Sequence, residues 1–328
     1  MKKEKMVVDC PLYFKQKELL ELRMHLLGGV VDEIVFFEGN RSYSGIPNEL
    51  ECKNVIDELD LPFKDKVRVV EVDMPTNDKI TLDHYDHVLT ERSCSWDRKT
   101  WHRERFLRDS VLSIVDDYPD DTVFILCDGD EYIKPELVTW FAEMARRYPD
   151  IVLRVPLVQL EGRADMRVYE KETDTPRMFD KNMVLCMKHH FRETKPSILK
   201  ENLKPDEFPD RTGPAPDGTP INRFDTNYVH QDGIRVEDCG WHFSWMGGGE
   251  AKINKLAAYS HYSDVIHFFK VPEMQSNAMK EFLMNQKIEE GSINVWGDPR
   301  TVMKKYPIQD LPQVIFELPK VRKFLFGA

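Results

Sequence analysis

Thr122-Val123-Phe124-Ile125-Leu126-Cys127-Asp128-Gly129-Asp130-Glu131 is the stretch that decides the expected fold, because it runs from apolar residues directly into three carboxylates. An apolar run of this length that follows a turn-like segment at residues 118–121 is typical of a strand buried on both faces. In open α/β sheets, ligands bind beyond the carboxyl ends of such strands. The stretch therefore predicts a central strand with a polar site at its carboxyl end.

Asp128 and Asp130 are the first candidate site residues. They lie two positions apart, so their side chains point the same way in an extended segment, and Gly129 lets the chain bend between them. Carboxylate oxygens suit Mg²⁺ or Mn²⁺, ions that commonly bridge to substrate phosphates. The pattern indicates a metal–diphosphate site. An acidic surface turn is the alternative, since Asp-x-Asp often arises by chance.

The rest of the first half alternates strands with helices. Apolar runs that predict strands lie at residues 6–10 (stopped by Pro11), 33–37, 67–72 and 151–155. Residues 17–27 have apolar residues at helical spacing and are followed by Gly28-Gly29, which predicts an amphipathic helix. Alternation of this kind through residue 156 predicts an α/β fold with a mostly parallel sheet and helices on both faces.

Polar residues also follow the strand at 33–37. Glu38, Asn40 and Arg41 fall at its carboxyl end, where the same rule places ligands. Ordinary turn chemistry explains this loop equally well, because Asn and Gly favour turns.

A helix is expected at residues 97–115, where aliphatic residues recur at spacings of three and four. Toward its N-terminus the same face carries Trp101, Glu104 and Arg108. Charges on an inward face need partners, because burying an unpaired charge is costly. Either Glu104 and Arg108 form a structural pair, or this end of the helix lines the site, with Arg108 facing a phosphate and Glu104 holding a hydroxyl.

The second half is less regular. Residues 162–226 are charged and rich in proline, and residues 200–227 are expected to form a long loop that orders on ligand binding. Residues 236–250 are more informative, because alternation there puts aromatic side chains on one face and His242 on the other. His242 is a candidate third ligand for a metal held by Asp128 and Asp130, since imidazole suits Mn²⁺. A core strand with a hydrogen-bonded histidine is the alternative.

The composition is that of a globular chain, with 328 residues, 41% apolar and 31% charged. Its net charge of −11 argues against general nucleic-acid binding, which needs a basic surface. The six cysteines show no zinc-site spacing, so reduced, packed thiols are expected. Without a signal-peptide pattern or an apolar run of membrane-spanning length, a cytoplasmic protein with no membrane span is expected.

Four blocks of the sequence match one known family in order and spacing. They are Val31-Asp32-Glu33 through Glu38-Gly39-Asn40-Arg41 to Ser44-Gly45; Trp101, Glu104 and Arg108; Asp128-Gly129-Asp130-Glu131 with Pro135; and Gly240-Trp241-His242-Phe243-Ser244-Trp245 with Lys255 and Ser260-His261. They resemble glycosyltransferase family 17, which includes the animal enzymes that add the bisecting N-acetylglucosamine to N-glycans. The last block is the most specific.

The resemblance implies a GT-A-type nucleotide-diphospho-sugar transferase fold, inverting chemistry, and a UDP-N-acetylglucosamine donor bound with Mn²⁺ or Mg²⁺. The expected metal ligands are Asp128, Asp130 and His242. The expected donor-binding residues are Glu38, Asn40, Arg41, Trp101, Glu104, Arg108 and Asp128. Residues 162–226, where acceptor choice is expected to lie, show no match to the family. The expected acceptor is therefore a glycan or glycoconjugate, and the N-glycan acceptor of the animal enzymes is not carried over.

The expected organisation is one transferase domain at residues 1–265, with a nucleotide-sugar-binding half (1–156) and an acceptor-side half (157–265). A helical extension at residues 266–328 is expected to pack on the same domain. In the expected reaction a metal neutralises the leaving UDP, and Glu250 or Asp238 deprotonates the acceptor hydroxyl. The competing classes are a metal-dependent phosphoesterase, which usually needs two metals and more ligands, and a non-catalytic glycan-binding protein.

Overall fold

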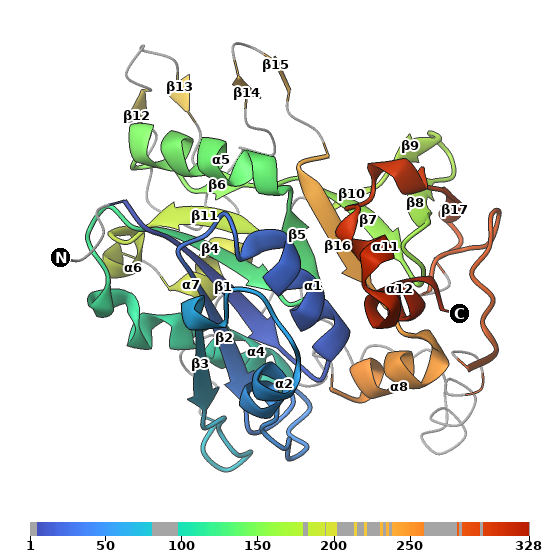
Figure 1. Ribbon diagram of the computed structural model, residues 1–328, viewed down its shortest axis with the longest axis horizontal. Helices are drawn as coiled ribbons and strands as arrows, with labels where there is room; N and C mark the ends of the chain where they lie inside the picture. Colours follow the sequence, from blue (N-terminus) through green and yellow to red (C-terminus); the bar gives the residue numbers. More distant parts are fainter. Residues whose placement is uncertain are drawn as a thin grey trace.

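The computed structural model (Figure 1) describes residues 5–80, 98–179, 183–193, 195–201, 238–258, 284–295 and 298–327, together with residue 281 and two-residue strands at 213–214, 220–221, 230–231 and 234–235. The longer described strands form two main sheets, and helices lie on both faces of the first. The protein is therefore an α/β protein, as its alternating pattern predicts, but its sheets are mixed where a mostly parallel sheet was expected.

The first sheet has the strand order β3-β2-β1-β4-β11-β6. Its strands are β1 (Val7–Tyr13), β2 (Glu33–Gly39), β3 (Val67–Val72), β4 (Val123–Asp128), β6 (Leu153–Arg154) and β11 (Val184–Met187). β1 to β4 run parallel to one another, whereas β11 is antiparallel to both β4 and β6. Because β2 and β4 run the same way, Gly39 and Asp128 end their strands at the same edge of the sheet.

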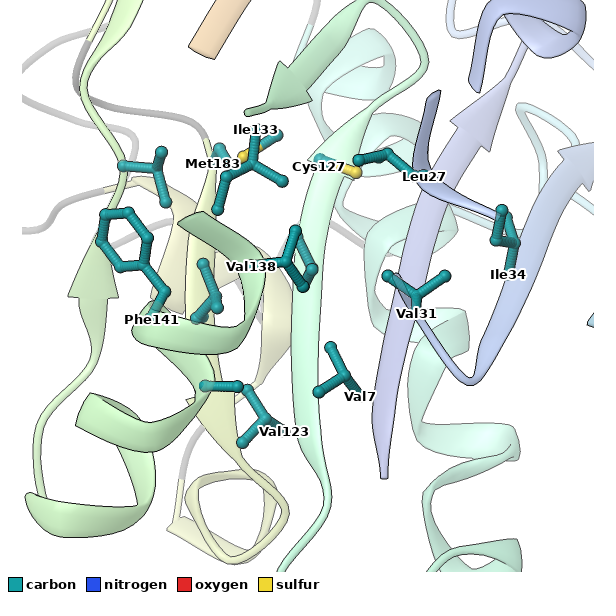
Figure 2. Packing of buried hydrophobic residues seen from close by; sticks show 14 of the residues in the cluster. Val7, Leu27, Val31, Ile34, Val123, Cys127, Ile133, Val138, Phe141 and Met183 are labelled. Carbon is teal, nitrogen blue, oxygen red and sulfur yellow. The ribbon is translucent and has the colours of Figure 1, made fainter. Parts of the chain in front are cut away.

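Helices cover both faces of this sheet, because successive strand residues point to opposite sides. The helices on one face are α1 (Lys17–Leu27), α2 (Cys52–Glu58) and α5 (Pro135–Arg147), and those on the other are α4 (Arg98–Asp109) and α7 (Pro196–Glu201). Val123 and Cys127 of β4 belong to the first layer, which Figure 2 shows with Val138 and Phe141 of α5, while Phe124 belongs to the second. Burial on both faces explains why β4 is apolar without alternation.

The second sheet has the order β17-β8-β7-β16-β5, with β9 beside β8 and β10 beside β7. Its strands are β5 (Glu131–Ile133), β7 (Leu157–Glu161), β8 (Met166–Glu170), β9 (Thr175–Pro176), β10 (Met178–Phe179), β16 (Gly240–Ser244) and β17 (Thr301–Lys305). β16 lies between β5, to which it is antiparallel, and β7, to which it is parallel.

Helix α1 belongs to the cores of both sheets. Leu20 and Met24 pack against the first, whereas Leu19 and Leu22 pack with Trp241 of β16. The C-terminal helices α11 (Val314–Glu317) and α12 (Pro319–Phe326) join this second core. The C-terminal segment therefore packs on the same body through a strand, β17, as well as through helices.

The chain crosses from one sheet to the other at the acidic turn. β4 ends at Asp128 and β5 begins at Glu131, so Gly129 and Asp130 form the connection. Gly129 is needed there, because a Cβ at this position would lie 2.6 Å from the Leu12 carbonyl oxygen. The predicted site thus lies at the seam between the sheets.

Two sequence expectations need correction. Pro11 does not end β1, since pairing with β4 runs through it while pairing with β2 lapses at Cys10 and Pro11. The helix expected at 97–115 stops at Asp109 and continues as 3-10 turns η3 (Ser110–Ser113) and η4 (Val115–Asp117). Hydroxyls of the two serines that bound η3 donate to backbone carbonyls three residues earlier, which competes with regular helix. β11 lies in the expected acceptor-side half and pairs with β4 of the nucleotide-sugar-binding half, so one sheet contains strands from both.

Most of the loop expected at residues 200–227, and the Ser260-His261 pair, lie outside the described residues. Among the helices that are described, none has both the length and the apolar character of a membrane span.

Candidate functional site

Arg23 of α1 holds the acidic turn from the core side. Its buried guanidinium donates to the Asp9 carboxylate at 2.7 Å and to the carbonyl oxygens of Asp128 (3.2 Å) and Glu131 (2.5 Å). Burial by itself lowers the pKa of Arg23, but the neighbouring Asp9 carboxylate outweighs it and the pKa is raised. A permanent buried cation therefore fixes two backbone carbonyls of the turn.

Glu131 closes the turn from the other side. It is fully buried, and its Oε2 accepts a hydrogen bond from the Asp128 backbone N–H at 2.8 Å. The third carboxylate of the acidic stretch therefore fixes the backbone that presents Asp128 and Asp130.

Asp130 faces two basic side chains from the second half of the chain. Lys255 of α8 (Gly248–Ala258) donates from Nζ to Oδ2 at 2.6 Å, and His242 Nε2 lies 3.6 Å from Oδ1. Burial by itself raises the pKa of Asp130, but Lys255 and His242 outweigh it and hold the pKa well below its usual range. Asp130 is therefore an ionised carboxylate despite its burial.

Asp128 faces the other half of the site. Its side chain is 29% exposed, and Arg108 Nη2 lies 3.1 Å from both of its carboxylate oxygens. The Nη1 atom of Arg108 donates to Glu104, one turn earlier on α4. Glu104 and Arg108 thus form the pair that their spacing predicts, and this pair reaches the acidic turn.

Glu38, Asn40 and Arg41 lie at the same sheet edge but are held within their own loops. Glu38 accepts hydrogen bonds from the backbone N–H groups of Glu51 and Cys52. Asn40 donates to the Asp73 carboxylate and accepts from the Met74 N–H. Arg41 donates to the Gly45 carbonyl. Glu38 therefore fixes the start of α2, and Asn40 ties the ends of β2 and β3 together. These contacts give both residues structural roles.

The loop after β2 is tied to two helices. The Tyr43 N–H donates to the carbonyl of Ala258, the last residue of α8, at 3.1 Å. Arg103 of α4 is buried and donates to the Tyr43 carbonyl, also at 3.1 Å. The helices that carry Arg108 and Lys255 are thus joined through this loop.

The remaining candidates are spread more widely. Trp101 is half-buried on α4, one turn before Glu104, and Glu250 is exposed in the first turn of α8. Asp238 precedes β16 and pairs with Arg167 at 3.0 Å, whereas Asp130 lies beside the far half of β16, where its carbonyl accepts the Phe243 N–H at 2.8 Å. The structure therefore does not bring Asp238 to the Asp130 group.

A second layer of buried charge lies behind His242. Glu161 ends β7 and pairs in register with Ser244, so its side chain falls on the His242 face of the sheet. It accepts the Val295 N–H at 3.0 Å, and burial raises its pKa to about 7. Lys252, one turn before Lys255, is also buried; burial lowers its pKa, and Glu161 opposes that shift.

The donor atoms around Asp130 fit a divalent cation with two protein ligands. Ligand bonds of about 2.0–2.2 Å allow two donors of one ion to lie up to about 4 Å apart, and Asp130 Oδ1 and His242 Nε2 are 3.6 Å apart. Within the described part of the chain, no three His, Cys, Asp or Glu side chains form a metal-binding group, and Asp128 faces Arg108 instead. Water and phosphate oxygens would complete the coordination, as they commonly do for Mg²⁺.

Arg23, Lys255 and Glu161 are features of the site that were given no role from the sequence. Arg23 falls on the apolar stripe of α1, and an arginine at such a position signals a buried ion pair. Glu161 follows an apolar run and precedes a glycine, which repeats the pattern of Asp128 and Gly129. Lys255 was part of the family match but had no assigned function.

No protein-family model matches this chain, and no curated protein shows a significant match to it. The resemblance to glycosyltransferase family 17 therefore stays a prediction, and the function must be argued from the residues themselves.

Proposed function

We propose that the protein is a metal-dependent inverting glycosyltransferase of the GT-A type, which moves a sugar from a UDP-sugar to a glycan acceptor. N-acetylglucosamine is the sugar that we expect first, from the family resemblance. The observation that carries the proposal is the Asp130 group, in which an ionised carboxylate, His242 and Lys255 converge at the seam beyond the carboxyl end of β4. Crevices outside the carboxyl ends of strands are where α/β folds bind ligands.

The charges of this group suit a nucleotide diphosphate. Asp130 and His242 would hold the metal, which when bound neutralises charge on the leaving diphosphate. Lys255 and Arg108 each place a cation beside the turn. Arg23 and Glu131 preorganise the turn, so these groups need not rearrange their backbone when the donor binds.

Of the two residues expected to deprotonate the acceptor hydroxyl, Glu250 and Asp238, only Glu250 remains a candidate in this geometry. Glu250 lies on the same helix as Lys255, about 7–8 Å along the axis for five residues, and its exposed side chain can meet an acceptor hydroxyl. Asp238 is engaged by Arg167 at the other end of β16. We therefore propose Glu250 as the base.

A panel of nucleotide sugars with Mn²⁺ tests this function. We expect UDP-sugars to raise the melting temperature when Mn²⁺ is present, and to be hydrolysed slowly without an acceptor. Asp130→Asn should remove both effects. Release of phosphate from phosphomonoesters would favour a phosphoesterase instead. Stabilisation by free glycans with no nucleotide effect would favour a binding protein.

A further inference from the structure

The pair between Lys255 and Asp130 combines close contact with partial exposure. The ammonium lies 2.6 Å from Oδ2, yet the lysine side chain is 20% exposed whereas that of Asp130 is 7% exposed. His242 faces the other carboxylate oxygen, Oδ1. The two oxygens of Asp130 thus have different partners, and one of these partners can reach solvent.

We propose that Lys255 is the counter-ion of Asp130 while the site holds no donor, and that it passes to the donor diphosphate when a divalent cation joins Asp130 and His242. This inference rests on the proposed function. It makes Lys255 a donor-binding residue whose partner changes during binding, a role that neither the acidic motif nor the family resemblance supplies.

The charge arrangement drives this change of partner. A divalent cation held by Asp130 and His242 would repel the Lys255 ammonium, because like charges a few ångströms apart repel strongly where water is scarce. A diphosphate brings negative charge that attracts the ammonium. A lysine suits such a change better than an arginine does, because its ammonium is a point charge on a flexible stem with no fork geometry to lose.

The surroundings of Lys255 confine the movement to its side chain. The carbonyl of Ala258, the last residue of α8, accepts a hydrogen bond from the Tyr43 N–H in the loop after β2, which holds this end of the helix in place. The Lys255 ammonium lies 5.4 Å from the centroid of the Trp245 ring, a contact that supports a cation without fixing it in one geometry. Arg108 differs, because it binds Glu104 as well as Asp128 and so has a second partner that holds it in place.

Calorimetric titration with Mn²⁺, in the absence and presence of UDP, tests the inference. The variants are Lys255→Met, Lys255→Arg and Asp130→Asn, with Lys320→Met, at an exposed position in the first turn of α12, as a control for net charge. We expect Lys255→Met to bind Mn²⁺ alone about 10- to 100-fold more tightly than the wild type, the range set by one charge-assisted hydrogen bond. Lys320→Met should stay within about twofold of the wild type, as surface substitutions do. Lys255→Arg keeps a cation on Asp130 and should therefore bind Mn²⁺ no more tightly than the wild type, and Asp130→Asn should lose Mn²⁺ binding.

UDP provides the second half of the test. It should tighten Mn²⁺ binding less in Lys255→Met than in the wild type, because the ammonium that joins the diphosphate is missing. Circular dichroism checks that each variant is folded, and Lys255→Gln replaces Lys255→Met if the latter is not.

The outcomes separate this inference from the proposed function. If Lys255→Met binds Mn²⁺ no more tightly than the wild type while Asp130→Asn loses it, the change of partner is wrong and the metal site stands. If Mn²⁺ fails to bind the wild type, or binds Asp130→Asn equally well, both the inference and the proposed metal site are overturned.

Discussion

Two buried ion pairs flank the same acidic turn, and they differ in what surrounds them. The Arg23–Asp9 pair is almost wholly buried, with side-chain exposures of 1% and 0%, and its guanidinium also holds two backbone carbonyls. The Lys255–Asp130 pair is equally close but keeps the lysine 20% exposed. The first pair has no room to exchange partners and serves the fold, whereas the second can exchange its cation. We therefore call the Arg23–Asp9 pair the clamp, because it holds the turn in one geometry. The Lys255–Asp130 pair is a contact whose cation can change partner.

Removing the clamp should have the largest effect on stability. Arg23→Met should lower the free energy of unfolding by about 3–5 kcal/mol, because it leaves Asp9 buried without its counter-ion. Urea denaturation measures the change, with Arg68→Met as a control, since Arg68 pairs with Asp117 at the exposed surface and should matter by less than about 1 kcal/mol. A loss for Arg23→Met as small as that of the control would contradict the clamp.

The buried carboxylate behind His242 should make stability depend on pH. The folded pKa of Glu161, about 7, lies above its ordinary value of 4.5, so the folded protein binds more protons between these values and stability falls as pH rises through this window. The full loss is about 3 kcal/mol at most. Glu161→Gln removes this term and can still accept the Val295 N–H.

As the pH rises from 4.5 to 8, the free energy of unfolding of the wild type should therefore fall relative to that of Glu161→Gln. Comparing the two proteins cancels titrations that they share. A difference that stays constant over this range would show that Glu161 does not titrate as expected.

Opening the turn should have an intermediate effect on both stability and binding. Glu131→Ala leaves the buried Asp128 N–H without its acceptor, which should lower the free energy of unfolding by about 1–3 kcal/mol. The turn then presents Asp130 less precisely, so UDP affinity in Mn²⁺ should also fall. Glu131→Gln keeps an acceptor and should behave more like the wild type in both measurements. Equal UDP binding by all three proteins would show that Glu131 does not position Asp130 for binding.

Lys255→Met should have the smallest effect on stability. Without metal, the free energy of unfolding should fall by about 1 kcal/mol, because the lysine is partly exposed and the pair is weakened by solvent. Saturating Mn²⁺ should offset this loss. A loss as large as that of Arg23→Met would make Lys255 a second clamp and erase the contrast between the two pairs.

The sequence predicts the parts of this protein that follow from local pattern. The span of α1 is predicted residue for residue, because apolar spacing and end signals are local. The apolar run before Asp128 gives the central strand. The register that places His242 beside Glu131 depends on pairing between segments more than a hundred residues apart. The local pattern therefore identifies residues 240–244 as a strand but cannot say which strands pair with it.

The sequence also predicts part of the site, where the local pattern marks a polar residue at the end of a strand or on one of its faces. Asp130 and His242 were named together, and the structure brings them within 3.6 Å of each other. Glu38 and Asp238 could not be sorted from the sequence, because a polar residue beyond a strand serves a loop or a ligand depending on partners elsewhere in the fold. Glu38 has its partners at the start of α2, and Asp238 has Arg167.

Equilibrium titration of UDP into the wild type and Asp130→Asn, with and without Mn²⁺, tests the central claim most directly. The proposed site at the end of β4 predicts that UDP binds the wild type tightly only when Mn²⁺ is present, and that Asp130→Asn loses this metal-dependent binding while remaining folded. UDP binding that is equally tight in Asp130→Asn, or that does not change with Mn²⁺, would contradict the claim.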